Sequence, residues 1–197
     1  FSVISAGSLI RVKGFGLAIR AFKKFSDKYP ASKLTIIGSG PEEPRLAELV
    51  RSYHLEHQVE LPGAIPRNDL LKKMASSDVL LFPSLRDGGG TVVIEAMSVG
   101  IPVICLDIGG PGMHINEECG IKVTPRSPEE TVEELAGALE RLYTDRELRS
   151  NLGKAARQKA AQSYTWERLG DRLMQIYDPI LRGDAAVHHL PEQSNHP

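Results

Sequence analysis

Short apolar runs rich in β-branched residues alternate with amphipathic stretches along most of the chain. The runs predict strands over residues 2–7, 33–38, 59–63, 79–84, 101–107 and 119–124. The stretches between them repeat apolar side chains at helical spacing, which predicts helices over residues 14–29, 42–53, 68–77 and 91–100. Because repeated strand–helix units form parallel sheets with right-handed crossovers, helices should cover both faces. The sequence therefore predicts an α/β fold, a Rossmann-like parallel sheet of about six strands.

From residue 127 onward the pattern is helical only. A capping box at residues 127–130 begins one helix, and the similar run at 144–147 predicts the same device for a second. A third helix is predicted to end near Gly183. Residues 184–197 are polar and lack a periodic apolar face, which predicts a frayed tail. The sequence therefore predicts one domain over residues 1–183.

The charge balance and the apolar content exclude several classes of protein. With 24 basic and 25 acidic residues among 197, the chain lacks the basic footprint of a nucleic-acid-binding protein. No apolar run approaches the ~18–20 residues of a membrane span, and the first residues lack the features of a signal peptide. Two cysteines are too few for a disulfide framework, so reduced thiols in a cytoplasmic protein are expected. Since Phe1 leads directly into a strand, the chain is expected to be a piece of a longer protein.

Four loops that follow predicted strands each contain at least two glycines: residues 7–14, 38–43, 83–90 and 107–112. Because ligands of parallel α/β sheets bind at the carboxyl ends of the strands, these loops are expected to share one edge of the molecule. They match neither the dinucleotide fingerprint G-x-G-x-x-G nor the phosphate loop G-x-x-x-x-G-K-[ST]. The chain also lacks an Asp-x-Asp pair and any Cys/His spacing suited to zinc, so no metal site is predicted. His114 is the histidine near the expected ligand edge.

Several segments follow one another in an order typical of one enzyme family: AGSLIRVKGFGLAIRAF, LTIIGSGPEEPRLAELV, VELPGAIPRNDLLKKMASSDVLLFPS, DGGGTVVIEAMSVGIPVICLDIGG and CGIKV. Over roughly residues 2–181, the chain thereby resembles the C-terminal domain of family 4 retaining glycosyltransferases. Enzymes of this family have the GT-B fold, in which two Rossmann-like domains face a cleft and the C-terminal domain binds the nucleotide-sugar donor. The resemblance implies one half of a GT-B enzyme, with an N-terminal acceptor domain that is absent from this chain.

The family signature is a pair of acidic residues with a glycine-rich turn after the first, here Asp87 and Glu95. The resemblance implies that Asp87 lies near the hydroxyls of the donor sugar and that Glu95 accepts hydrogen bonds from the ribose. It also implies that Lys13 neutralises the leaving diphosphate, without a metal or another cofactor. Ala64 and Ile65 would lie under the nucleobase. The residues expected to bind the donor, with Asp87 and Lys13 as the catalytic ones, are Gly7, Ser8, Lys13, Ala64, Ile65, Asp87, Gly89, Gly90, Thr91, Val92 and Glu95.

Elementary physics supports a diphosphate at the glycine turn. A helix that begins after Gly90 presents unpaired N–H groups and a partial positive charge of ~0.5 of an elementary charge. Glycines let phosphate oxygens approach those N–H groups, since no Cβ is in the way. Simpler interpretations stay open: a mobile glycine loop, a surface role for Glu95, a capping role for Asp87, a solvated Lys13 and a plain turn at Ala64.

Two positions depart from the family pattern. Ser8 stands where the family has an arginine, which removes a bidentate phosphate contact. Asp87 stands where a glutamate is usual, and Gly89 replaces a bulkier aromatic residue, so the sugar pocket is expected to be reshaped. We hypothesise that Arg11 or Arg86 compensates for Ser8.

Together these observations predict a retaining glycosyltransferase that transfers a sugar from a nucleotide-diphosphate sugar to an acceptor. The expected pathway is the synthesis of cell-surface polysaccharide or lipopolysaccharide. This chain would be the donor-binding domain, able to bind nucleotide but inactive alone. The alternative is a degenerate, non-catalytic domain that binds nucleotide or a protein partner, which Ser8 and Asp87 favour. An unrelated dehydrogenase-like domain would respond to NAD instead.

The family's bacterial members often work at the cytoplasmic membrane face, so a cytoplasmic protein with peripheral contact with the inner membrane is expected. Four basic residues of one predicted helix are weakly consistent with an anionic surface, although a solvated helix face is the simpler interpretation: Arg20, Lys23, Lys24 and Lys28. The last helix, about residues 165–181, is expected to reach across to the N-terminal domain and to expose part of its apolar face here.

Overall fold

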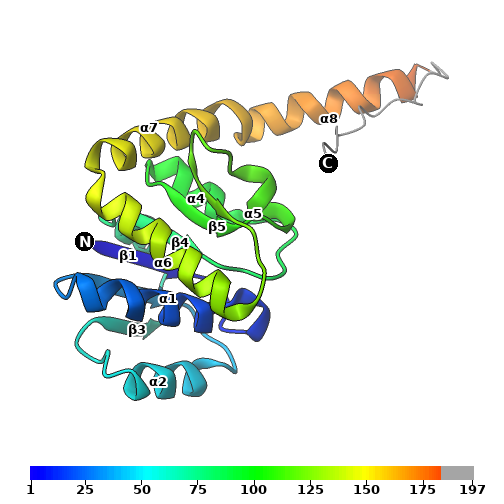
Figure 1. Cartoon of the computed structure of the whole chain (residues 1–197). Helices are drawn as coiled ribbons and strands as arrows, with labels where there is room; N and C mark the ends of the chain where they lie inside the picture. The colour runs from blue at the N-terminus through cyan, green and yellow to red at the C-terminus, as the bar shows by residue number, and fades with distance from the viewer. Residues whose placement is uncertain (183–197) are drawn as a thin grey trace. The chain divides into compact units, whose positions relative to one another are not determined.

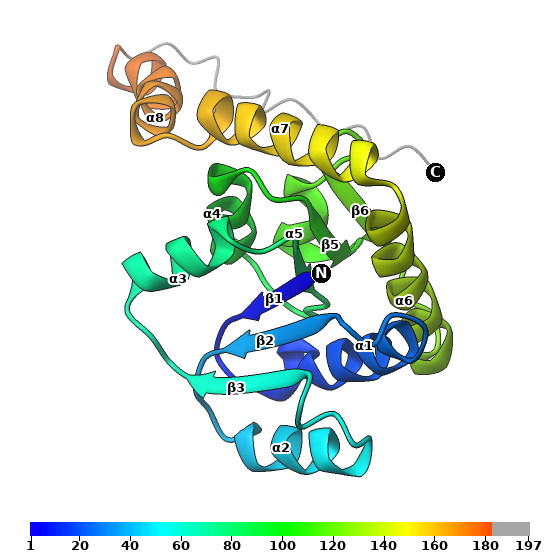
Figure 2. The same cartoon turned by 90° about the vertical axis from the view of Figure 1, so that its left-hand side faces the viewer.

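The computed structural model describes residues 1–182 and contains one parallel sheet of six strands (Figures 1 and 2). The strands are β1 (Ser2–Ala6), β2 (Lys33–Ile37), β3 (Val59–Gly63), β4 (Val79–Phe82), β5 (Val103–Leu106) and β6 (Gly120–Val123). Their order is β3-β2-β1-β4-β5-β6, so the chain moves outward from β1 and later returns beside it with β4. The predicted strands and fold class are thereby confirmed. The reversal between β1 and β4 is the position at which ligands bind in sheets of this kind.

Helices cover both faces of the sheet. The helices between the strands are α1 (Phe15–Lys28), α2 (Glu43–Ser52), α3 (Arg67–Ala75), α4 (Thr91–Val99) and α5 (Gly109–His114). The helices after β6 are α6 (Pro128–Thr144), α7 (Arg146–Ser163) and α8 (Trp166–Leu181). Helices α1, α2 and α6 lie together on one face, and α3, α4 and α5 lie on the other (Figure 2). Because crossovers are right-handed, the reversal after β3 places α3 on the face opposite α1 and α2.

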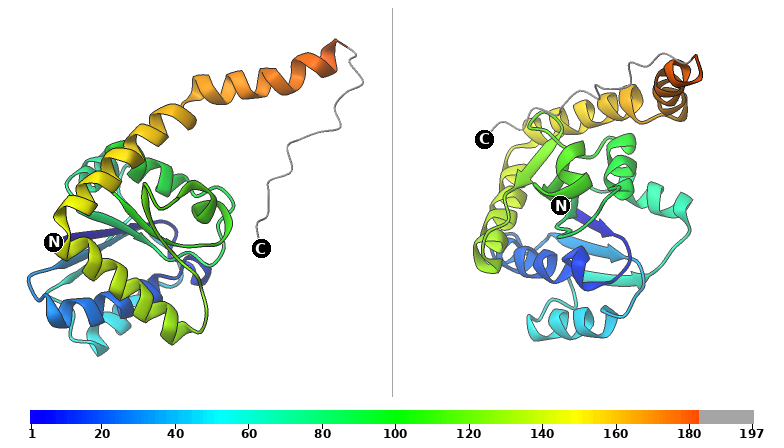
Figure 3. Two further views of the ribbon diagram at one scale, coloured as in Figure 1. Left: turned by 45° about the horizontal axis from the view of Figure 1, so that its top comes forward. Right: turned by 90° about the vertical axis from the view of Figure 1, so that its right-hand side faces the viewer.

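The middle of the sheet is buried by helices on both sides. Every residue of β4 and β5 is buried. This explains their unbroken apolar runs, because a parallel strand covered on both faces needs apolar side chains on both. Helix α1 contributes Phe22 and Phe25 to the core and packs along α6 (Figure 3). The edge strand β3 alternates exposed with less exposed residues instead.

Two elements at the carboxyl edge of the sheet were not predicted. One is α5, whose sequence GGPGMH has glycines and a proline that hide any helical period. The other is a 3-10 turn, η1 (Arg11–Lys13), which precedes α1. Both lie in loops that were predicted to surround a ligand.

One of the two predicted helix caps is confirmed. The Ser127 hydroxyl accepts the Glu130 N–H at 3.2 Å, and the Glu130 carboxylate accepts the Ser127 N–H at 3.1 Å. The device predicted at 144–147 is wrong, because Asp145 and not Thr144 accepts the Leu148 N–H, at 2.8 Å. Thr144 still belongs to the last turn of α6, where its hydroxyl donates to a carbonyl of the same helix.

The residue contacts divide the chain into two compact units, Phe1–Ala160 and Ala161–Pro197. The described part of the second unit is the end of α7 together with α8. Helix α8 has no buried residue, and its large apolar side chains are exposed: Trp166, Leu169, Leu173, Met174, Ile176, Tyr177, Ile180 and Leu181. The expected exposed apolar face of the last helix is therefore present, whereas the predicted tail, 184–197, lies outside the described residues. Within residues 1–182, no helix is long and apolar enough to cross a membrane.

Candidate functional site

A cavity of 380 Å³ lies at the carboxyl ends of β1, β2 and β3, beside α3 and α4. It is lined by Ala6, Gly7, Ser8, Ile37, Gly38, Ser39, Ala64, Ile65, Leu70, Thr91, Val92 and Glu95. Seven of the residues predicted to bind a donor are among them: Gly7, Ser8, Ala64, Ile65, Thr91, Val92 and Glu95. The structure thus brings together predicted residues from three separate segments, while the roles given to them stay predictions. The other four predicted residues are not in the lining: Lys13, Asp87, Gly89 and Gly90.

The loops after β1 and β2, which both line this cavity, contact each other through their backbones. A Cβ at Gly38 would lie 1.9 Å from the carbonyl oxygen of Gly7, and Gly38 has a φ of +148°. The Leu9 N–H donates to the Ser39 carbonyl at 2.8 Å, which joins the two loops a second time. Only glycine fits a position that is both this crowded and at this φ. The close approach of the loops is therefore fixed by sequence.

An ion pair between Lys13 and Asp87 connects the loop after β1 to the loop before α4. The two side chains are only 18% and 15% exposed, so the pair is largely shielded from water. The other carboxylate oxygen of Asp87 accepts the N–H of Gly89 at 3.1 Å and the N–H of Gly90 at 2.8 Å. Lys13 and the amino end of α4 therefore face the same point, which is a geometry suited to an anion.

The contacts of the Gly89 and Gly90 amides differ from those expected at a donor site and agree with the capping role that stayed open for Asp87. The prediction directs these amides to a diphosphate and places Asp87 beside a sugar, whereas in the structure both amides donate to Asp87 itself. The short aspartate side chain explains the difference, because its carboxylate reaches N–H groups shortly after it in an Asx turn. An anion that binds at this point has to compete with Asp87 for Lys13 and for both amides.

These contacts also set the protonation of Asp87. Partial burial raises the pKa of Asp87, but the hydrogen bonds from Lys13, Gly90 and Gly89 and the charge of Lys13 together outweigh it and hold the pKa below its usual value. Asp87 is therefore ionised at neutral pH, and the ammonium group of Lys13 balances its charge.

We expect Asp87→Asn to lower the free energy of unfolding by about 1–3 kcal/mol at pH 7, because it removes a charge-assisted contact with Lys13. A carboxyl group with a depressed folded pKa stabilises the fold above its unfolded pKa of about 3.9 and loses that contribution as the pH falls through the folded value. The stability difference between the wild type and Asp87→Asn should therefore be constant from about pH 7 to 5 and shrink below about pH 4. Urea unfolding at each pH measures it.

Asp69→Asn is the control for this experiment, because it removes an exposed ion pair, that of Asp69 with Lys72. The two side chains of that pair are 56% and 79% exposed. It should change stability by less than about 0.5 kcal/mol. Equal losses in the two variants, or a difference for Asp87→Asn that does not narrow in acid, would contradict the described role of the Lys13 contact.

Helix α5 holds the glycine turn from its other side. The Gly110 N–H donates to the Asp87 carbonyl at 2.8 Å, and a Cβ at Gly110 would lie 2.7 Å from the carbonyl oxygen of Gly88. His114 Nε2 lies 2.9 Å from the carbonyl oxygen of Gly89, so Nε2 must carry a proton to donate. His114 thus lies at the ligand edge, where the sequence placed it. Its contact with the glycine turn depends on the fold and had no signal in the sequence.

Glu95 lines the cavity with a side chain that is 13% exposed, and its carboxylate accepts a hydrogen bond from Arg67 Nε at 2.6 Å. Arg67 is the first residue of α3, and its side chain is 71% exposed. The sequence did not point to Arg67. A positive charge in the first turn of a helix is unfavourable, because it opposes the helix dipole. This unfavourable position was the one signal in the sequence that Arg67 has a stabilising contact elsewhere.

Neither Arg11 nor Arg86 is among the residues that line the 380 Å³ cavity with Ser8. Arg11 lines a separate cavity beside α1 and α6. Compensation for Ser8 by either arginine therefore stays a hypothesis. Arg67 is an arginine that contacts a residue of the cavity lining, Glu95.

The basic face of α1 is largely neutralised by acidic residues. The ion pairs are Lys23–Asp27, Lys24–Glu133 and Lys28–Glu140. Two of the three acidic partners belong to α6. These ion pairs leave α1 and its neighbour α6 with little net positive charge to attract an anionic surface.

The described residues offer no cluster for metal binding: within residues 1–182, no group of three or more His, Cys, Asp or Glu side chains could hold an ion. Cys105 and Cys119 are free and buried. Burial raises the pKa of Cys105 to about 12, so its thiol is not a ready nucleophile. The polar groups that the structure places at this edge include the carboxylates of Asp87 and Glu95, Lys13 and the N–H groups of Gly89 and Gly90.

Known proteins resemble this chain over most of its length. A glycosyltransferase of Methanocaldococcus jannaschii, itself uncharacterised, is 30% identical over 176 residues, which are 89% of this chain and 44% of that protein. WcaL of Escherichia coli, a glycosyltransferase assigned to colanic acid biosynthesis, is 32% identical over 185 residues, 90% of this chain and 45% of WcaL. The pneumococcal O-GlcNAc transferase GtfA, solved with UDP and GlcNAc, shares the fold with a TM-score of 0.81 at 22% identity, over 91% of this chain and 36% of GtfA.

This chain spans less than half the length of these three proteins. The family model of glycosyl transferases group 1 matches residues 1–159, and the chain therefore belongs to this family.

Proposed function

We propose that this chain is the donor-binding domain of a retaining glycosyltransferase that uses a nucleotide-diphosphate sugar. The observation that carries the proposal is the 380 Å³ cavity, which Thr91 and Val92 line at the amino end of α4. Lys13 and Asp87 are not in the lining, but Asp87 accepts a hydrogen bond from Gly90, the residue before Thr91. Ligand pockets of proteins measure about 300–1,000 Å³, so the cavity is large enough for part of such a donor. The presence of UDP and GlcNAc in GtfA, which has the same fold, supports a nucleotide sugar as the ligand.

Each part of the donor has a matching group in the proposed arrangement. The nucleobase lies against Ala64 and Ile65, and the ribose hydroxyls donate to Glu95. The diphosphate takes the ammonium group of Lys13 and the N–H groups at the start of α4, where the helix dipole favours negative charge. The donor sugar then lies beside the Asp87 carboxylate.

The same groups explain how the reaction is accelerated in this proposal. Transfer breaks the bond between the anomeric carbon and the diphosphate, and negative charge develops on the leaving oxygen. Groups that bind this charge more tightly in the transition state than in the ground state increase the rate. Lys13 and the α4 amides meet that requirement and supply the positive charge that a metal would otherwise provide. The Asp87 carboxylate faces the positive charge that develops on the sugar.

The acceptor and the rest of the reaction belong to the whole protein. We place the acceptor on an N-terminal domain, because the relatives are more than twice as long as the matched region. The exposed apolar face of α8 is a suitable contact for that domain. The similarity to WcaL supports a role in polysaccharide synthesis. We place this activity in the cytoplasm, in peripheral contact with the membrane face.

A ligand panel on the 197-residue chain tests the donor site. We expect UDP, GDP or ADP, or one of their sugars, to raise the melting temperature of the wild type. Glu95→Gln should weaken the binding of the best ligand by about 10- to 100-fold, because the ribose loses a charged acceptor. Isothermal titration measures the affinity.

The matched control is Glu60→Gln, since Glu60 also pairs with a basic residue, Lys73, at 3.7 Å, but does not line the cavity. Its affinity should stay within about twofold of the wild type. Equal losses in both variants would overturn the assignment of Glu95 to the ribose.

The second candidate function is a degenerate domain without catalysis. Its specific support is the contact of Asp87 with Lys13 and both glycine amides, which occupies the groups that a diphosphate needs. In the form that binds a protein partner, this candidate predicts that none of the nucleotides or their sugars stabilises the chain. A response to NAD alone would favour a dehydrogenase-like domain instead.

A further inference from the structure

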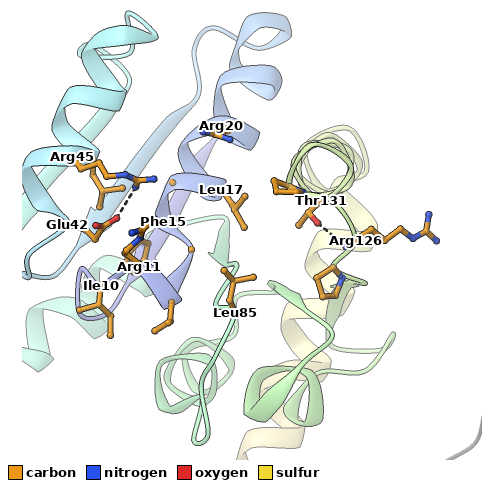
Figure 4. A pocket seen from close by; sticks show the side chains of 16 residues that line it. Ile10, Arg11, Phe15, Leu17, Arg20, Glu42, Arg45, Leu85, Arg126 and Thr131 are labelled. Carbon is orange, nitrogen blue, oxygen red and sulfur yellow. Dashed lines mark hydrogen bonds and ion pairs between the residues drawn. The ribbon is translucent and has the colours of Figure 1, made fainter.

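A second cavity, of 430 Å³, lies between α1, the start of α2 and the start of α6 (Figure 4). It is separate from the 380 Å³ cavity of the proposed donor site, because no residue lines both. Lys13 of the turn η1 pairs with Asp87, whereas Arg11, Val12 and Gly14 line the second cavity.

The lining of this cavity is positively charged. Arg11, Arg20 and Arg45 line it together with a single carboxylate, Glu42, which pairs with Arg45 at 2.8 Å. Within residues 1–182, neither Arg11 nor Arg20 has an ion pair or a hydrogen bond through its side chain. Since the whole chain carries a formal charge of −1, this excess of positive charge is local. Arg126 is not counted, because it points away from the cavity (Figure 4).

The amino end of α1 adds to this charge. Its N-cap, Gly14, provides no side-chain cap, and the first turn contains no acidic residue. A Cβ at Gly16 would lie 3.5 Å from Nη1 of Arg45, so the guanidinium group lies against this first turn. A cationic fork beside uncapped N–H groups is an arrangement that binds phosphate. The neighbouring end of α6 differs, since its own capping box satisfies it.

The rest of the cavity is apolar. Leu17 of α1 and Leu85 of the loop after β4 point toward one another in its middle (Figure 4). Leu85 is 49% exposed, and Ile10 and Val12 at the same cavity are 38% and 40% exposed. Exposed apolar side chains grouped beside arginines indicate a ligand that has both an anionic and an apolar part.

We propose that this cavity is a second binding site, for a phosphate monoester whose organic group is apolar. The phosphate binds Arg20, Arg45 and the first N–H groups of α1, and the organic group lies against Leu17 and Leu85. This inference is independent of the proposed donor site, because it shares no residue with the 380 Å³ cavity.

Hexyl phosphate is the probe, with inorganic phosphate and hexyl glucoside as the anionic and the apolar comparison. We expect the 197-residue chain to bind hexyl phosphate at least about tenfold more tightly than either comparison probe. In ¹H–¹⁵N spectra the shifts should centre on the amides of Phe15 and Gly16, the first two residues of α1, and saturating UDP should not displace the probe.

The variant Arg20→Gln/Arg45→Gln should lose about tenfold or more of the affinity for hexyl phosphate. Arg51→Gln is the matched control, because Arg51 lies on the same helix as Arg45 and also pairs with a glutamate three residues before it, Glu48. Its affinity should equal that of the wild type. The proposal is overturned if hexyl phosphate binds no better than a comparison probe, if UDP displaces it, or if both variants bind alike.

Discussion

Lys13→Met will weaken the binding of a nucleoside diphosphate by about 10- to 100-fold and leave the binding of the bare nucleoside unchanged. Methionine keeps the apolar stem of lysine and removes the ammonium group. In the structure that group pairs with Asp87, and Asp87 in turn accepts the N–H of Gly90 at the amino end of α4. The loss should scale with phosphate, because only the phosphates interact with that charge. Isothermal titration of UDP, UMP and uridine against the 197-residue chain measures it, with GDP or ADP in place of UDP if the panel favours them.

Asp87→Asn should have the opposite effect on the same titration. The Asp87 carboxylate accepts from Lys13 and from two amides that the proposal gives to the diphosphate. Removing its charge removes a competitor, so the diphosphate should bind at least as tightly as to the wild type. This opposite sign separates the proposed diphosphate site from a purely structural ion pair, whose two partners would give losses of one sign.

Lys122→Met is the control. Lys122 also pairs with an aspartate, Asp107, at 2.8 Å, but neither residue lines the 380 Å³ cavity. It should leave all three affinities unchanged. Equal weakening of UDP and uridine by Lys13→Met would show that Lys13 positions the fold and does not bind the diphosphate. The same titration with Arg11→Ala and Arg86→Ala tests the compensation for Ser8, which is wrong if neither variant weakens UDP.

The sequence predicted the fold well because its signals are local. Each strand is a short run bounded by turn residues, and the order of the runs leaves few topologies for a parallel sheet. The cavity could also be located, since the carboxyl ends of the strands must lie at one edge. Seven lining residues, Ser8 and Glu95 among them, were named through the family resemblance.

The contacts within the site could not be predicted, because they join distant residues. Lys13 meets Asp87 across 74 residues, and Arg67 meets Glu95 across 28. The period of a helix says where a side chain lies on its own element and nothing about its partner on another. Helix α5 was missed for a related reason, because tertiary contacts with the glycine turn hold a sequence of low helix propensity.

Gly14→Ala should lower the free energy of unfolding by about 3–5 kcal/mol, through left-handed backbone strain and overpacking together. Gly14 has a φ of +69°, and a Cβ there would lie 2.0 Å from the carbonyl oxygen of Pro83. A backbone atom cannot turn aside as a side chain can, so the loop after β1 and the loop after β4 must separate. Those loops carry Lys13 and Asp87, and the variant should therefore also weaken diphosphate binding.

Gly63→Ala is a control with nearly the same backbone strain and no crowding. Its φ is +79°, and nothing lies within 4 Å of the added Cβ. It should cost only about 1–2 kcal/mol, the strain of a left-handed alanine, and leave nucleotide affinity unchanged. Urea unfolding and UDP titration of both variants separate the effect of backbone strain from the effect of crowding. Equal losses of stability in Gly14→Ala and Gly63→Ala would mean that positive φ alone explains the effect. The close contact between Gly14 and Pro83 would then not be what holds the two loops together, and with them Lys13 and Asp87.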